Sequence, residues 1–212
     1  EGLGLSRSAE YATALLNYAT AKTAFRQIDE ALALYARVEE IYEQTIAPDD
    51  YRFASLYNNM AQAVMRAGRA AEAYGYFERS LARLSPADDA AEIATCRTNM
   101  AFCLLAQRKP DEAGECLKLA EEIYASLPDD PHAASALSCR GQLEYMRGEF
   151  LRAAEYFAKS AASVKRFFGR TANYAAACRS CAKSLEAAGK PDEAAKYRAL
   201  ADSAGGAARG AR

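Results

Sequence analysis

The 212-residue chain has no tryptophan and a single histidine, His132. Acid–base and metal chemistry depend most often on histidine beside a fixed carboxylate or further metal ligands, and no such group accompanies His132. The sequence also lacks a glycine-rich phosphate loop, a zinc-protease helix motif and a serine nucleophile elbow. We therefore expect a protein that is not an enzyme and has no metal or other cofactor.

No apolar run approaches the roughly eighteen residues of a membrane span. The chain has 27 Lys and Arg against 28 Asp and Glu, whereas nucleic acids and anionic membranes attract proteins with a basic surplus. Its six cysteines fall in predicted helices, which indicates buried thiols in a reducing compartment rather than disulfides. We expect a cytoplasmic protein without nucleic-acid or membrane partners.

No stretch alternates apolar and polar residues strictly enough to predict a β-strand. Small residues instead recur at intervals of 42, 40, 40 and 41 residues, at Ala19, Ala61, Ala101, Gly141 and Ala182. Twelve residues after each comes an alanine: Ala31, Ala73, Ala113, Ala153 and Ala194. Small residues on two helices let their backbones approach closely. The spacing predicts a five-fold repeat of helical hairpins.

The turn inside each hairpin has its own pattern. Gly68, Gly148 and Gly189 hold the turn in three repeats, because glycine adopts the left-handed conformation that ends a helix at no steric cost. Arg26 and Arg108 hold the same position in two other repeats.

These small residues and turns resemble the tetratricopeptide repeat family. Repeats of 40–42 residues exceed the standard unit of about 34. Together with the stretch from Leu56 to Ala61, that length is similar to the kinesin-light-chain-like repeats of bacterial proteins. The family's usual tryptophan is absent. The resemblance implies an all-α fold: a right-handed α-solenoid of about five helix-turn-helix repeats, ten helices in all, with a concave groove.

We expect one solenoid over residues 1–203 and a disordered tail over 204–212, which is rich in alanine and glycine. The predicted repeats cover residues 7–46, 50–84, 88–126, 132–168 and 171–203. The acidic pairs Glu39–Glu40 and Glu121–Glu122 fall on predicted outer helix faces, where we expect them to be solvated.

The resemblance also implies that the first helix of each repeat lines the groove. The groove residues are then Asn17, Thr20, Asn58, Asn59, Gln62, Met65, Asn99, Phe102, Gln142, Tyr145, Arg179 and Lys183. Asn17, Asn59 and Asn99 occupy one repeat position, and a carboxamide can bond both sides of a peptide backbone. The same asparagines also fit a structural role, as hydrogen bonds that lock neighbouring repeats.

The sequence thus predicts a non-catalytic scaffold that binds a peptide or protein segment in its groove. Two alternatives stand beside it. The first is a structural module that associates with itself into a homo-oligomer, and the second is a regulatory or sensory fragment of a longer protein.

Overall fold

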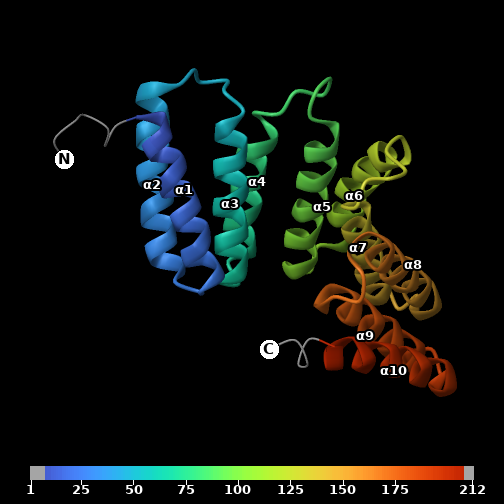
Figure 1. Cartoon of the computed structure of the whole chain (residues 1–212). Coiled ribbons are helices and arrows are strands. Elements are labelled where there is room, and N and C mark those ends of the chain that lie inside the picture. Colours follow the sequence, from blue (N-terminus) through green and yellow to red (C-terminus); the bar gives the residue numbers. More distant parts are fainter. Residues whose placement is uncertain (1–7, 208–212) are drawn as a thin grey trace. The chain divides into compact units, whose positions relative to one another are not determined.

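The structure, a computed structural model, describes residues 8–207, and these residues form ten α-helices and no strand. Figure 1 shows the helices following one another as antiparallel neighbours within each part of the chain. They are α1 (Ala9–Ala24), α2 (Ile28–Thr45), α3 (Arg52–Arg66), α4 (Ala70–Leu81), α5 (Ala90–Ala106), α6 (Pro110–Ala125), α7 (Ala133–Met146), α8 (Phe150–Phe168), α9 (Ala172–Ala187) and α10 (Pro191–Ala207). The prediction of an all-α fold with ten helices is confirmed.

The chain divides into two compact units, Glu1–Gln107 and Arg108–Arg212. Unit 1 contains α1–α5, and unit 2 contains α6–α10. The single solenoid over residues 1–203 therefore stays a prediction. None of the described helices combines the length and the apolar character that crossing a membrane requires.

One predicted boundary is wrong. Helix α10 continues to Ala207, so the tail predicted over 204–212 starts four residues too early. The reason is packing: Ala201 and Ala204 are buried in one apolar cluster with Tyr174. Helices gain most of their stability from such contacts. Residues 208–212 lie outside the described residues.

The hairpin turns adopt the left-handed backbone conformation in glycine and arginine alike. Gly68 has φ of 78°, and Arg26 and Arg108 both have φ of 61°. After α1, the Gln27 amide donates to the Lys22 carbonyl at 3.0 Å, which closes the helix end. The two arginines therefore take a conformation that side chains resist, as the sequence pattern predicts.

Close packing explains the small residues of the repeat. The five second-helix alanines, from Ala31 to Ala194, are completely buried. Gly141 occupies the tightest of the first-helix positions, because a Cβ built there would lie 3.0 Å from the Phe157 ring. Such a contact is shorter than ordinary van der Waals packing, so the α7–α8 crossing depends on the missing side chain.

Candidate functional site

The predicted groove residues all lie on the first helices of the repeats. Helix α1 carries two of them, α3 four, and α5, α7 and α9 two each. None of the twelve side chains is buried: each is exposed or half-buried. The predicted groove residues of each unit are therefore accessible.

The three asparagines of the shared repeat position have accessible side chains. Asn17 is exposed, and Asn59 and Asn99 are half-buried. Within residues 8–207 their carboxamides form no hydrogen bond with another protein group. Their donors and acceptors are therefore open to a ligand or to water.

Two buried serines make hydrogen bonds between the helices of their own repeat. Ser80 of α4 donates to the Ala54 carbonyl of α3 at 2.9 Å, and Ser160 of α8 donates to the Ala134 carbonyl of α7 at 2.8 Å. Both serines stand nineteen residues after the small residue of their repeat. Both bonds join the two helices of one repeat, so the inter-repeat role considered for the asparagines stays a prediction.

Glu39 takes part in a cluster that joins three helices of unit 1. The Tyr57 hydroxyl of α3 lies 3.1 Å from the Glu39 carboxylate of α2. Arg79 of α4 pairs with that carboxylate, donates to the Tyr57 hydroxyl at 2.9 Å, and places its guanidinium 4.0 Å from the Tyr57 ring centroid. Burial, followed by the nearby Glu39 charge, raises the pKa of Tyr57. The expectation of a solvated Glu39 is wrong.

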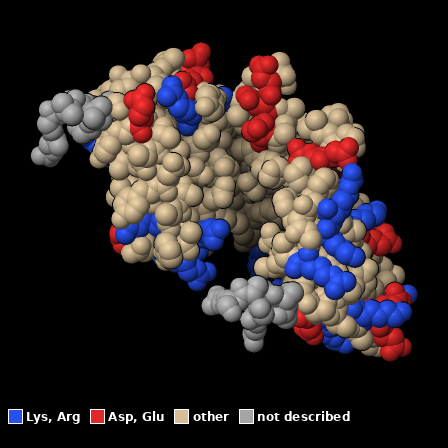
Figure 2. Space-filling view, in the orientation of Figure 1, with Lys and Arg blue, Asp and Glu red and all other residues tan. Residues whose placement is uncertain are grey.

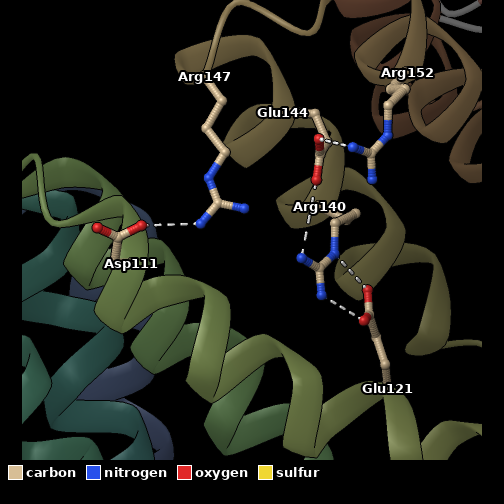
Figure 3. A network of polar contacts seen from close by, with 6 residues as sticks. All are labelled: Asp111, Glu121, Arg140, Glu144, Arg147 and Arg152. Carbon is tan, nitrogen blue, oxygen red and sulfur yellow. Dashed lines mark hydrogen bonds and ion pairs between the residues drawn. The ribbon is translucent and has the colours of Figure 1, made fainter.

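Glu121 is likewise an ion-pair partner rather than a solvated acid. Figure 3 shows Arg140 of α7 between Glu121 of α6 and Glu144 on its own helix. Arg140 makes two hydrogen bonds to Glu121, and Arg152 of α8 lies 3.3 Å from the Glu144 carboxylate. The side chain of Glu144 is only 3% exposed. This charge network connects α6, α7 and α8.

The charge network replaces apolar residues, and the sequence held a signal for it. Repeat alignment places Glu144, three residues after Gly141, where α3 has Val64 and α5 has Leu104. Arg140 stands correspondingly at the position of two buried methionines, Met60 and Met100. This pair of opposite charges at apolar repeat positions is the sequence signal for the network, and the groove positions do not include it.

An open recess of about 310 Å³ lies among α7, α8 and α9. It is lined by Ser138, Gln142, Tyr145, Met146, Phe157, Ser180, Lys183 and Ser184. The recess brings together three predicted groove residues, Gln142, Tyr145 and Lys183. The Lys183 ammonium lies 4.8 Å from the centroid of the Tyr145 ring, within reach of a cation–π interaction.

The other five lining residues, Ser138, Met146, Phe157, Ser180 and Ser184, are outside the predicted groove set. Phe157 reaches it from α8, a second helix, and Ser184 lies one residue beyond the predicted Lys183. No first-helix pattern points to Phe157. The recess gathers no metal site, and among residues 8–207 no group of three or more His, Cys, Asp or Glu side chains has the arrangement to hold an ion.

Comparison with known proteins agrees with this architecture. Residues 52–126 match the family model of the tetratricopeptide repeat. No curated protein matches the chain.

Three solved structures share the fold. A putative kinesin light chain from Podosopora anserina with nearly identical TPR-like repeats has a TM-score of 0.72 at 17% identity, over 95% of this chain and 97% of that one. BtubC (BKLC) from P. vanneervenii has a TM-score of 0.73 at 20% identity, over 98% and 90%. A Rap protein complexed with Competence and Sporulation Factor has a TM-score of 0.78 at 18% identity, over 90% of this chain and 52% of that one.

The fold and these likenesses define the class as a TPR-like helical-repeat solenoid. Residues 52–126 match the tetratricopeptide repeat model, and two of the similar structures are named as kinesin-light-chain-like proteins, which agrees with the resemblance that the sequence pattern indicated.

Proposed function

We propose that this chain is a non-catalytic scaffold that binds an extended segment of another protein along the first helices of its repeats. The observation that carries the proposal is the open hydrogen-bonding capacity of Asn17, Asn59 and Asn99 at one repeat position. An extended backbone offers alternating donors and acceptors, which carboxamides can pair with irrespective of sequence. The TPR fold, generally used for protein interaction, agrees with this role.

The experiment begins with peptides selected from a random twelve-residue phage library on the purified protein. Asn59→Ala removes one carboxamide, and each hydrogen bond contributes roughly 0.5–1.5 kcal/mol net. We expect the affinity of a selected peptide, measured by fluorescence anisotropy, to fall by up to about tenfold. The melting temperature should stay unchanged, because the half-buried Asn59 side chain leaves no buried partner behind.

Asn173→Ala is the matched control, since Asn173 is an exposed asparagine in the first turn of α9. This variant should change neither affinity nor melting temperature. A lower melting temperature for Asn59→Ala with unchanged affinity would show an inter-repeat lock. A selection that yields no binding peptide would contradict the proposed function itself.

A second candidate function, self-association, has an observation of its own. Tyr11 and Tyr18 of α1 are 40% and 53% exposed, whereas their repeat equivalents Phe53 and Met60 of α3 are buried. Helix α1 therefore exposes the face that is buried in the equivalent first helix α3. Tyr18→Glu separates the two functions: light scattering should show a smaller particle if α1 mediates a homo-oligomer, and peptide binding should persist.

A further inference from the structure

The two units differ in charge. Unit 1 has 10 Lys and Arg against 14 Asp and Glu, whereas unit 2 has 17 against 14. Figure 2 shows Lys and Arg side chains gathered over the α7–α8 part of unit 2 on the face in view. Arg209 and Arg212 of unit 2 lie outside the described residues, and residues 108–207 have 15 Lys and Arg against 14 Asp and Glu. The acidic excess of the chain therefore belongs to unit 1 and not to the unit that contains the recess.

Lys183 is the cation that lines the recess, and a second cation lies near it on α9. This second cation is Arg179, which lies one helical turn earlier on the same exposed face of α9. Neither side chain forms an ion pair within residues 8–207, and no Asp or Glu is among the lining residues. A second recess of about 300 Å³ among α8–α10 differs, because its Lys190 pairs with Glu193 at 2.9 Å.

Small side chains replace the asparagines of the repeat in unit 2. The position of Asn59 and Asn99 is taken by Cys139 in α7 and by Ser180 in α9. Ser180 lines the recess together with Phe157, whose ring approaches α7 at Gly141. Unit 2 therefore lacks the asparagines proposed to bind a peptide backbone, and it has instead a recess that can receive a side chain.

We propose that the recess receives an Asp or Glu side chain of the bound segment, with Lys183 as its counter-ion. The proposal rests on the proposed function and names its partner chemistry. The hydroxyls of Ser138 and Ser180 make no hydrogen bond within the described chain, so they are open donors for a carboxylate. A single ammonium matches a single negative charge, and Arg179 adds to the attraction at the rim.

The specificity test compares random-library selections on three proteins. Peptides selected on the wild type should be enriched in Asp and Glu, and those selected on Lys183→Glu should be enriched in Lys and Arg. Lys159→Glu is the matched control: Lys159 of α8 also lies over a tyrosine, 5.4 Å from the Tyr156 centroid, but outside the recess. Its selection should resemble that of the wild type.

Affinity gives a second readout. Changing the enriched Glu of a selected peptide to Gln should weaken binding to the wild type by about threefold to tenfold, and added salt should reduce this difference. The same peptide change should have little effect on binding to Lys183→Gln. Equal losses on both proteins would show that the acid contacts another residue.

Methionine methyl NMR locates the bound peptide. The chain has four methionines, of which Met146 alone belongs to unit 2 and lines the recess, whereas Met60 and Met100 are only 4% exposed in unit 1. The acidic peptide should shift the Met146 methyl signal and leave the Met60 and Met100 signals in place. Peptides that bind without acidic preference, or without moving Met146, would overturn this inference and leave the proposed function standing. Failure of every peptide to bind would overturn both.

Discussion

The guanidinium of Arg140 meets the carboxylate of Glu121 through two parallel hydrogen bonds, with Nε–Oε1 at 2.9 Å and Nη2–Oε2 at 2.6 Å. This geometry fixes both partners, and Glu121 is the main reason that the pKa of Arg140 is raised. The Glu144 carboxylate lies 4.0 Å from the same guanidinium. Arg140 therefore holds two carboxylates from two helices.

Removing Arg140 should destabilise unit 2 strongly. In Arg140→Met the Glu144 carboxylate stays buried with Arg152 as its only cation, and breaking such a buried pair costs about 3–5 kcal/mol. The double variant Arg140→Met/Glu144→Leu restores the residue types of the other repeats and should recover most of that loss. Urea unfolding followed by circular dichroism measures both.

Arg147→Met is the matched control for that series. Its ion pair with Asp111 is exposed, with Asp111 95% accessible, so the loss should stay below about 1 kcal/mol. If Arg140→Met/Glu144→Leu were as unstable as Arg140→Met, the view that Arg140 and Glu144 stand in place of an apolar pair would be wrong.

Glycine should stabilise the two arginine turns. Arg26→Gly and Arg108→Gly relieve a left-handed conformation with φ of 61°, and each should gain about 0.5–1 kcal/mol despite the extra freedom of the unfolded chain. Gly68→Ala is the reverse test: a Cβ there meets no atom within 4 Å, so any loss of about 1 kcal/mol comes from the backbone alone. The urea concentration at the unfolding midpoint, compared between each variant and the wild type, measures these changes. No gain in either arginine variant would sink the argument.

The cysteines should react in a defined order. All six are thiols in the structure, five are buried and Cys116 is half-buried. Burial raises the pKa of Cys96 to about 12 and that of Cys103 to about 11, so hardly any thiolate forms at pH 8. Iodoacetamide should modify Cys116 first in the folded protein, and all six after unfolding in urea. Mass spectrometry that finds Cys96 modified as fast as Cys116, or four or fewer thiols after unfolding, would contradict this.

Asp50 should make stability depend on acid. The hydrogen bonds from the Arg52 side chain and backbone amide lower the pKa of Asp50 to about 2 from its usual 3.8. A lowered folded-state pKa adds stability that is complete above the ordinary value and is lost as pH falls through about 2. The urea midpoint should therefore drop between pH 4 and pH 2, less steeply in Asp50→Asn. Asp49→Asn, at the exposed neighbour, should leave the slope unchanged.

The sequence was sufficient to predict the helices because their spacing is enforced at every repeat. Ala61 and Ala73 pack at zero exposure, so any larger residue would separate the helices. The left-handed turns followed for the same reason, since Arg26 occupies the place of Gly68 in a geometry that cannot change.

The recess and the charge network could not be predicted from the first helices alone. Phe157 enters the recess from α8 because Gly141 leaves room for its ring, a relation between two helices. The sequence predicted Glu121 as one half of an exposed acidic pair, because nothing in its own helix indicates the hydrogen bond from Arg140 of the next helix. Both features depend on side chains from different helices, which a repeat alignment examines one position at a time.

The charges of α7 also affect which neighbour the fourth hairpin can pack against in a chain of similar repeats. Alignment places Leu81 of α4 and Ala161 of α8 at the repeat position of Glu121. A helix hairpin that closed against either of them would remove the Glu121 carboxylate from Arg140 and leave only Glu144 of the same helix, at 4.0 Å, at a cost of several kcal/mol. An apolar residue at this repeat position can pack against many different side chains, whereas Arg140 needs a carboxylate on the neighbouring helix. One ion pair thus gives the fourth hairpin a fixed place in the order of the stack.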